Sequence, residues 1–552
     1  MLCQGEFKKR MLGLFVFCLV TGVVNGCTSC SAALNATLKE LMLCKSHLVV
    51  GLSVSVVKSD KVLFVEGYSN DNTSVTGDTV FQIASLSKAF ASTLLVKLIE
   101  EKTEYSLDTK IKTILRNDHI FNDSLRSEYT TVRDLLSHRT GIPQNNRIRL
   151  NTNLTRSNLI HRLKYLKAEK EFRGSYIYSS LLYGLVTYIT EMIGGDTWEN
   201  LVSKFIFEPL GMKSSAFVTT ANPEKINLAQ GFRDFYGDFH PVPFEFSKYY
   251  GELCGSGCIL STAVDMTKWM TFHLNGGKLS DGRRLISEKA FKEITTAVNT
   301  VPNDMYTYKY YTKPKVPVTT AISGYALGWR SGFYGGNRMF IHGGSTYGYR
   351  ALMSWYPDAD LGIFIALTGN DPNYFIRQVL HNYIFDIYTN QTPYINSTAT
   401  LCSFPQPWYD YTPNTKLNVT KSLAMSRQKT DYIGNYYNPA YGHIQVKGHE
   451  DMNKLTLIYG VSTFILYPKE AKDEFYGDSV GLTKYLFNFY TFRFDIECDN
   501  PYLEIPKFES MSPPVFQKSR DNANRALTIF KSGFDQLIFM VVLYAVAQTR
   551  TF

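Results

Sequence analysis

The chain carries little charge for its length. Asp, Glu, Lys and Arg make up 19% of its 552 residues, and the formal net charge is +9. No basic cluster interleaved with aromatic residues occurs, so the sequence gives no indication of a nucleic-acid partner. Repeats with the period of a solenoid are also absent. With 44% apolar residues, the composition is that of a globular chain and not of a disordered one. A chain of this length should fold into more than one domain.

Hydrophobic runs long enough to cross a membrane are missing as well. Met11–Val24 is shorter than the roughly 20 residues that a spanning helix needs. It follows the basic stretch Lys8–Arg10 and precedes small residues, which is typical of a secretory signal peptide cleaved after Gly26. A membrane-anchored N-terminus is the alternative. Leu537–Ala547 near the C-terminus is shorter still, and we expect a packed terminal helix there and no stable membrane anchor.

Histidines at metal-ligand spacing are lacking beside the cysteines, so neither a metal nor another cofactor is expected. Of the nine cysteines, Cys3 and Cys18 lie within the predicted signal peptide. Their removal leaves an odd number in an oxidising compartment, so at least one thiol stays single or pairs with another molecule. Cys254 and Cys258 share a glycine-rich loop. They either bond to each other or pair with distant cysteines.

Sequons for N-glycosylation are frequent, which supports export from the cell. Their asparagines are Asn35, Asn72, Asn122, Asn153, Asn390, Asn396 and Asn418. We therefore expect a secreted, extracellular glycoprotein.

Hydrophobic periodicity organises the first part of the chain. Leu48–Val57 and Lys61–Gly67 alternate across a short turn, which predicts a β-hairpin. Phe81–Glu101 places apolar residues at helical spacing. Strand periodicity returns at Tyr349–Leu367, and a helix at Tyr374–Tyr388 completes this unit.

Composition changes near residue 389. From there to residue 421 the chain is rich in Pro, Thr and Asn, which is typical of a linker, and strand-rich sequence follows. The expected organisation is a signal peptide at 1–26, a main domain at 27–388, a linker at 389–421, a β-rich accessory domain at 422–520 and a C-terminal tail at 521–552.

The segment Phe81–Glu101 carries the first candidate for chemistry. Ser85 and Lys88 are three residues apart, so on a helix they lie on one side, one turn above the other, whereas Ser87 points elsewhere. Serine is a weak nucleophile and needs an adjacent base. A buried lysine can be that base, because desolvation lowers its pKa. The alternative is an ordinary amphipathic helix with an incidental Ser and Lys.

Two further motifs complete a pattern. Tyr178-Ser179-Ser180 stands at a predicted helix start, and His342-Gly343-Gly344 stands on a glycine-rich strand. Together with S-x-x-K they correspond to the three motifs of penicillin-binding proteins and serine β-lactamases.

With these motifs the chain resembles the class C β-lactamase and D-alanyl-D-alanine carboxypeptidase family, the peptidase S12 serine hydrolases and esterases. The resemblance spans roughly residues 48–388. It is supported by TVRDLLSHRTGIP, PLGMKSSAF, GSGCILSTAVDMTKW and YALGW. The overall layout is similar to secreted invertebrate members such as the gigasin type of molluscan shell matrix.

The resemblance implies an α/β (α+β) fold in which an antiparallel sheet is flanked by helices. It also implies a small β-barrel domain behind the main domain, in the region of YIGNYYNPAYGHIQV. By the same resemblance, Ser85 would be the catalytic nucleophile, and Lys88 and Tyr178 would share general-base and general-acid duty. The backbone N–H groups of Ser85 and Ser345 would form the oxyanion hole.

Other site residues are implied in the same way. His342 would face the leaving group or a substrate carboxylate, with a charge that varies near neutral pH. Ser180, Gly343 and Gly344 would line the substrate site, and Ser180 is shorter than the asparagine usual at its position. His138 in the S-H-R-T-G stretch is expected to be structural.

Two functions follow as hypotheses. The first is an active serine hydrolase that acts through an acyl-enzyme on small-molecule or peptide substrates, namely esters, peptides or D-amino-acid amides. The second is a structural or binding protein, with extracellular matrix components as partners, that keeps the fold without relevant turnover.

Overall fold

The computed structural model describes residues 29–44, 49–70, 73–102, 104–302, 320–371, 375–403, 406, 419–421, 423–487 and 491–519. The predicted signal peptide, the apolar run near the C-terminus and the sequons at Asn72 and Asn418 lie outside the described residues.

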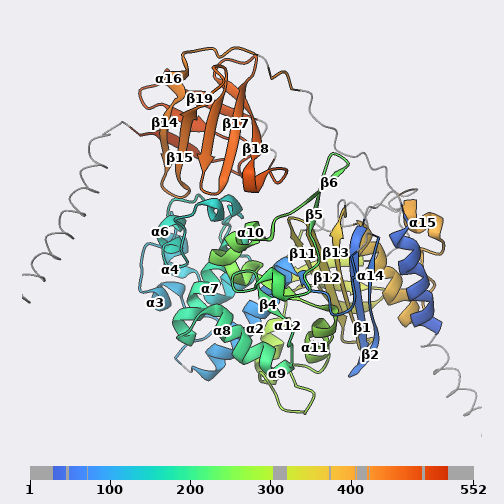
Figure 1. Cartoon of the computed structure of the whole chain (residues 1–552). Helices are drawn as coiled ribbons and strands as arrows, with labels where there is room; N and C mark the ends of the chain where they lie inside the picture. The colour runs from blue at the N-terminus through green and yellow to red at the C-terminus, as the bar shows by residue number, and fades with distance from the viewer. Residues whose placement is uncertain are drawn as a thin grey trace, which may run out of the picture.

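An eight-stranded antiparallel sheet forms the centre of the main domain (Figure 1), in the order β2-β1-β13-β12-β11-β10-β9-β8. Its strands are β1 Val49–Lys58, β2 Lys61–Ser69, β8 Asn299–Thr300, β9 Thr320–Tyr325, β10 Arg330–Tyr334, β11 Asn337–Thr346, β12 Tyr349–Tyr356 and β13 Leu361–Gly369. β1 and β2 form the predicted hairpin, with Lys58 paired to Lys61. β13 is buried along its whole length, as expected of a strand covered on both faces.

Helices cover both faces of the sheet. One face packs against α14 and a helix at residues 29–42, through buried residues such as Leu38 and Leu380. The other packs against α2, α7, α11 and their neighbours. The α-helices are α2 Ser87–Glu101, α3 Ile111–Leu115, α4 Ser124–Tyr129, α5 Val132–Leu136, α6 Leu159–Leu163, α7 Ser180–Gly194, α8 Trp198–Val202, α9 Glu208–Leu210, α10 Phe244–Ser247, α11 Ala263–Leu274, α12 Glu288–Thr295, α14 Phe375–Tyr388, α15 Thr398–Ser403 and α16 Lys429–Tyr432.

Short elements complete this domain. A three-stranded sheet has the order β3-β7-β4, and β5 and β6 form a separate pair. These are β3 Phe81–Gln82, β4 Ala216–Phe217, β5 Phe232–Phe235, β6 Asp238–Pro241 and β7 Ile259–Ser261, with the 3-10 helices η1 Ala84–Leu86, η2 Asn146–Leu150, η4 Pro223–Lys225 and η5 Lys248–Ser256, and the π-helical turn η3 Ser203–Phe207. A further 3-10 helix, η7 Gly481–Thr483, belongs to the barrel described next.

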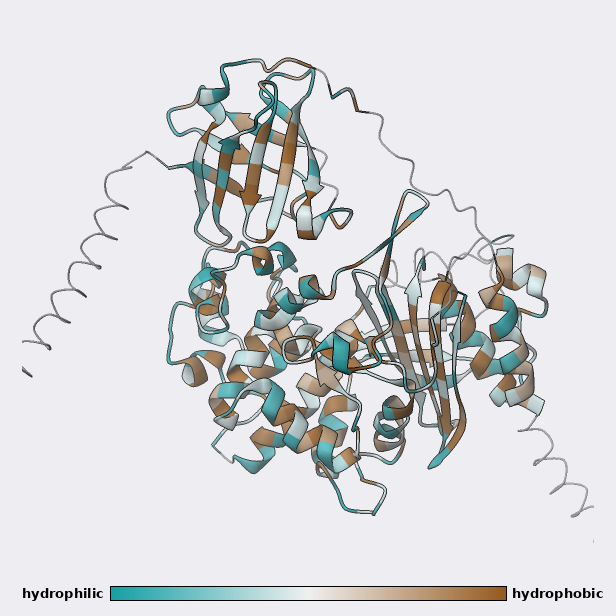
Figure 2. Cartoon of the chain, in the orientation of Figure 1, coloured by the Kyte–Doolittle hydropathy of each residue, from teal (hydrophilic) through white to brown (hydrophobic). Residues whose placement is uncertain are grey.

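The accessory domain is a closed eight-stranded barrel, β14 to β21, which confirms the expected fold class. Its strands are β14 Gly434–Asn438, β15 Gly442–Gly448, β16 Leu455–Tyr459, β17 Ser462–Pro468, β18 Glu474–Val480, β19 Phe492–Asp495, β20 Tyr502–Glu504 and β21 Val515–Lys518. Every second residue of β16 and β17 is buried, and apolar and polar residues alternate along these strands in Figure 2. Aromatic side chains, including Phe464 and Phe494, fill the interior.

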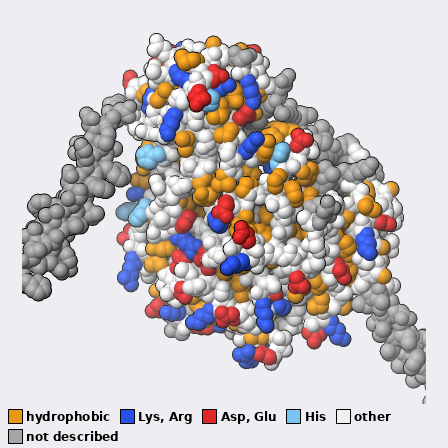
Figure 3. All heavy atoms as spheres, in the orientation of Figure 1, with side chains coloured by type: hydrophobic (Ala, Val, Ile, Leu, Met, Phe, Trp, Pro, Cys, Tyr) orange, Lys and Arg blue, Asp and Glu red, His pale blue; other side chains and the backbone are white. Residues whose placement is uncertain are grey.

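The barrel sits directly on η2 of the main domain. The N–H of Val461 donates to the carbonyl oxygen of Leu150 over 3.2 Å. A Cβ at Gly460, whose φ is +53°, would lie 1.8 Å from that same oxygen, so this contact requires glycine. Asn145 Nδ2 donates to the Tyr441 hydroxyl over 2.8 Å. The two domains therefore share a packed interface (Figure 3).

Part of the predicted linker folds as a helix that is anchored to the main domain. Residues 398–403 form α15, Leu401 is buried, and Cys402 forms a disulfide with Cys44. Cys254 and Cys258 are bonded to each other, which settles the alternative left open by the sequence. Within the described ranges, no helix is both long enough and apolar enough to cross a bilayer.

Candidate active site

Ser85 lies on a sharp turn between β3 and α2. Ala84 before it has a φ of 47°, in the left-handed region, although it is not glycine. That conformation costs about 1–2 kcal/mol. Ser85 belongs to η1, and its half-buried side chain borders a cavity of about 1120 Å³. Ser87, in contrast, is fully buried, and its hydroxyl oxygen accepts a hydrogen bond from the N–H of Ile259 over 3.0 Å.

Lys88 lies in the first turn of α2, and its side chain contacts Ser85. Its Nζ lies 3.2 Å from Ser85 Oγ, as the three-residue spacing predicts. It also donates to the carbonyl oxygen of Ser256 over 2.9 Å. The side chain is fully buried. Burial, assisted by the positive charge of Arg330, holds the pKa of the Lys88 amine well below its usual range. A neutral amine beside the hydroxyl can accept its proton.

The Tyr-Ser-Ser motif reaches the same point from the start of α7. Lys88 Nζ lies 4.8 Å from the centre of the Tyr178 ring and 3.2 Å from Ser180 Oγ. Both Tyr178 and Ser180 line the cavity with Ser85. The first two motifs, about ninety residues apart in sequence, therefore meet around one amine.

The His-Gly-Gly motif lies on β11, beside Ser85. β10 pairs with β11 only as far as Ile341, so among the described residues the following edge of β11 has no strand partner on that side. A Cβ at Gly344 would lie 2.1 Å from the carbonyl oxygen of Ile83. Glycine at this position thus lets the strand approach the Ser85 turn, and Gly343 and Ser345 line the cavity beside it.

His342 differs from the expectation. Its side chain is fully buried and is not among the residues that line the cavity. Nε2 lies 3.1 Å from the Tyr325 hydroxyl, and Nδ1 lies 2.8 Å from the carbonyl oxygen of Gly343. Burial, reinforced by the positive charge of Arg330, holds the pKa of His342 well below its usual range. The imidazole is therefore neutral at neutral pH, and the predicted change of charge near pH 7 is wrong.

The known proteins that resemble this chain can now be considered. The family model described as Beta-lactamase matches residues 34–380. The chain belongs to the beta-lactamase family. Gigasin-6 of Magallana gigas is 37% identical over 243 residues, which are 43% of this chain and 80% of that protein. The unguisins hydrolase ungD of Aspergillus violaceofuscus is 25% identical over 340 residues, 57% of each chain.

The fold is found in solved structures too. The octameric penicillin-binding protein homologue from Pyrococcus abyssi is 19% identical and superimposes with a TM-score of 0.54. That match covers 88% of this chain and 99% of the other. The likeness therefore extends beyond the main domain of this beta-lactamase family member.

His138 positions Tyr178 in this family member. Its Nδ1 accepts a hydrogen bond from the N–H of Ser179 over 3.1 Å, and its carbonyl oxygen accepts one from the N–H of Ile177 over 3.3 Å. The hydrogen bonds of His138 to the backbone of both sequence neighbours thus fix the position of Tyr178. Burial holds the pKa of His138 well below its usual range, so Nδ1 stays an acceptor. The structural role expected from the sequence agrees with these contacts.

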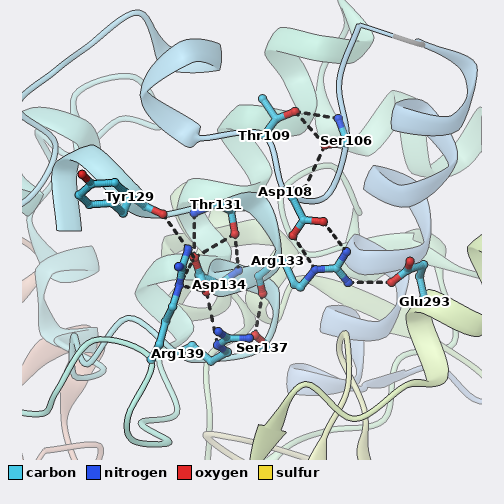
Figure 4. A network of polar contacts seen from close by, with 11 residues as sticks. Ser106, Asp108, Thr109, Tyr129, Thr131, Arg133, Asp134, Ser137, Arg139 and Glu293 are labelled. Carbon is cyan, nitrogen blue, oxygen red and sulfur yellow. Dashed lines mark hydrogen bonds and ion pairs between the residues drawn. The ribbon is translucent and has the colours of Figure 1, made fainter. Parts of the chain in front are cut away.

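A buried carboxylate anchors the helix that carries His138. Figure 4 shows Asp134 of α5 among its partners. Its Oδ2 accepts hydrogen bonds from the N–H and the hydroxyl of Thr131 over 3.0 and 2.9 Å, which forms a capping box. Arg173 NH2 pairs with the same oxygen over 2.7 Å. These bonds fix the N-terminal end of α5, and the opposite end of this helix leads through Ser137 to His138.

Two arginines of the site were not identified from the sequence. Arg330 directly follows the YALGW stretch; its guanidinium carbon lies 5.5 Å from the Tyr178 ring centre, and it borders the cavity. Arg377 of α14 is 1% exposed and pairs with Asp371. Its NH1 donates to the carbonyl oxygen of Gly344 over 2.6 Å, so it braces the strand that carries Ser345.

The barrel contributes the roof of the cavity. Residues 506–510, between β20 and β21, line it together with Ser85. The N–H of Arg147 donates to Glu509 Oε1 over 2.7 Å. Burial raises the pKa of Glu509 to about 7. In the part of the chain that the structure describes, no group of three His, Cys, Asp or Glu side chains is arranged to hold a metal.

Proposed function

We propose that this chain is a secreted serine hydrolase that acts through an acyl-enzyme on esters, peptides or D-amino-acid amides. The observation that supports the proposal most strongly is the buried Lys88 amine at 3.2 Å from the Ser85 hydroxyl, at the border of a large cavity, with a pKa that burial holds well below its usual range. A nucleophile and base at this distance are the requirement of covalent catalysis by serine.

In the first step, Lys88 Nζ accepts the proton of Ser85 Oγ as that oxygen attacks the substrate carbonyl carbon. The carbonyl oxygen becomes an oxyanion, which the N–H groups of Ser85 and Ser345 stabilise; one such donor is typically worth about 3–4 kcal/mol of barrier. The ammonium of Lys88, with Tyr178, returns the proton to the leaving group as its bond to carbon breaks.

In the second step, water attacks the acyl-enzyme and gives its proton to the same base. The acid product leaves, and Ser85 regains its hydroxyl. Ser180, whose Oγ is 3.2 Å from Lys88 Nζ, contacts the base in addition to its expected place in the substrate site. Because Ser180 is short and His342 is neutral and buried, we propose that small activated esters are hydrolysed better than β-lactams.

Secretion is supported by two features. The disulfide Cys44–Cys402 joins the N-terminal part of the main domain to the predicted linker, and structural disulfides are typical of oxidising compartments. The sequon asparagines Asn122, Asn153, Asn390 and Asn396 are exposed, so they are accessible to glycosylation.

A fluorophosphonate probe tests the proposal. Wild-type protein should be labelled, Ser85→Ala should not, and Ser87→Ala is the matched control that should still be labelled. A folded wild-type protein that takes up no phosphonate or ester acyl group would contradict the hydrolase and favour a matrix protein without turnover. Labelling that persists in Ser85→Ala would contradict the assignment of the nucleophile.

A further inference from the structure

Besides Arg330 and Arg377, four further arginines line the cavity. We call them the arginine wall: Arg147 and Arg149 of η2, Arg233 of β5 and Arg350 of β12. On the face shown in Figure 3, Lys and Arg side chains are interspersed with Asp and Glu. Two members of the arginine wall, Arg149 and Arg233, form no salt bridge among the described residues.

Arg149 is a buried guanidinium without a carboxylate partner. It is 8% exposed, and no ion pair involves it within the described residues. NH2 donates to the Tyr250 hydroxyl over 2.9 Å, and the guanidinium carbon lies 3.7 Å above the Tyr250 ring. Its Nε is buried without a hydrogen-bond partner. An unpaired buried charge is unfavourable, and this one borders an open cavity in which an anion could bind.

Arg233 repeats this arrangement from another element. Its side chain is half-buried, lines the same cavity, and has a buried Nε without a hydrogen-bond partner. No salt bridge involves Arg233 among the described residues.

The carboxylates of the cavity do not neutralise the wall. Asp371 pairs with Arg377. Glu509 accepts from the backbone N–H of Arg147 over 2.7 Å, and its pKa of about 7 leaves it only partly ionised at neutral pH. Neither carboxylate forms an ion pair with Arg149 or Arg233 among the described residues.

The wall has a defined position relative to Ser85. β11 runs from His342 through Ser345 to Thr346. Thr346 Oγ1 donates to the Tyr250 hydroxyl over 2.7 Å, the same hydroxyl that Arg149 contacts. Arg147 NH1 donates to the Tyr347 hydroxyl over 2.6 Å. Arg350 lies opposite Ser345 in the pairing of β12 with β11. Three of the four arginines are therefore tied to Ser345 or to the two residues that follow it, on the side of Ser345 away from His342 along the chain.

We propose that the arginine wall binds a carboxylate on the acyl part of the substrate, so that the site selects esters and amides of dicarboxylic acids, acidic peptides among them. This inference rests on the proposed hydrolase function. Arginine suits the role because its planar fork of donors matches a carboxylate.

Two esters of equal length test the selection. Mono-p-nitrophenyl adipate differs from p-nitrophenyl hexanoate only in a terminal carboxylate in place of a methyl group. At low ionic strength we expect kcat/KM, corrected for spontaneous hydrolysis, to favour the adipate by roughly tenfold to a hundredfold, the range for a hydrogen bond to a charged group. The preference should decrease as salt is added.

Variants identify the residues responsible. Arg233→Gln and Arg149→Gln should each lower the adipate-to-hexanoate ratio of kcat/KM by about tenfold. Arg283→Gln, at a 77% exposed side chain, is the matched control and should keep the ratio. Since Arg149 is buried, its variant could fail to fold, and the half-buried Arg233 then carries the test. A ratio near one in the wild type, or unchanged in a folded Arg233→Gln, would overturn the proposal.

A binding measurement on an inactive variant distinguishes a failure of this inference from a failure of the proposed hydrolase function. In Ser85→Ala, which needs no turnover, calorimetry should detect adipic acid monoamide and give at least tenfold weaker binding of hexanamide. If wild type hydrolyses neither ester but this difference is seen, the hydrolase function fails and the arginine wall stands. Equal binding of the two amides would overturn the wall whatever the activity.

Discussion

Two buried basic side chains lie on opposite faces of β11, and they have opposite chemistry. Lys88 approaches from α2 without a carboxylate, and burial lowers its pKa well below the usual range. Arg377 approaches from α14, pairs with Asp371 and donates to the carbonyl oxygens of Gly344 and Ala351. Burial without a counter-ion disfavours the charged form of an amine, so the amine can act as a base. A buried guanidinium with a counter-ion keeps its charge and can hold a strand in place through hydrogen bonds.

The largest effect should come from replacing the base. Lys88→Met keeps the volume and removes the proton acceptor, so phosphonate labelling of Ser85 should slow by roughly 10²–10⁴-fold, the usual worth of general-base catalysis. Thermal stability should not fall, because an unpaired buried amine is replaced by an apolar chain. Labelling at the wild-type rate in Lys88→Met would show that Lys88 is not the base, and the contrast with Arg377 would fail.

Replacing Arg377 should instead lower the stability of the protein. Arg377→Met leaves Asp371 buried without a partner, which should lower the free energy of unfolding by about 3–5 kcal/mol. Denaturant titration measures this. Replacing both partners, Arg377→Met with Asp371→Leu, should recover much of the loss. If the single variant is as stable as wild type, the ion pair does not hold β11.

His342 offers a third comparison, because it lies beside the base but should not titrate with it. Burial keeps the pKa of the imidazole well below 6.5, so the His342 charge should add no step to the pH dependence of labelling above pH 6. In His342→Gln the pH at which labelling rises should stay where it is in wild type. Should that rise disappear, the titrating group would be His342 and not Lys88.

The smallest effect concerns the barrel contact at Glu509. Burial raises the pKa of this carboxyl to about 7, above the roughly 4.3 of an unfolded glutamate. The folded state thus holds the proton more tightly, so its stabilising contribution is complete below about pH 4.3 and is lost as pH rises through 7. In Glu509→Gln the melting temperature should change less between pH 5 and 8 than in wild type. Parallel profiles would show that Glu509 does not titrate in this range.

The sequence could predict those parts of the site that depend on the spacing of residues close together in the chain. Ser85 and Lys88 are one helical turn apart, and a three-residue step on a helix determines their contact. The glycine of His-Gly-Gly was identified as a motif, although its reason, the close approach of Gly344 to Ile83, needs two distant segments. Strand-rich sequence predicted a β-rich C-terminal domain, and the family resemblance, not the strand pattern, implied that it is a barrel.

Other contacts could not be predicted because they join distant residues of ordinary type. Arg377 and Gly344 are 33 residues apart, and no pattern marks one arginine as the residue that holds β11. Arg149 and Arg233 line the same cavity only because the fold brings η2 and β5 to it. The predicted titration of His342 was wrong for a related reason: its charge depends on burial by Tyr325 and its neighbours, which the motif alone does not contain.

Mass-spectrometric peptide mapping of the phosphonate-labelled wild type between pH 5 and 9 tests the central claim most directly. The account predicts a single label on the peptide that contains Ser85, with a rate that follows one ionisation well below pH 10.5, the ordinary value of a lysine amine. A label on another serine, or a rate that rises only near pH 10, would contradict it.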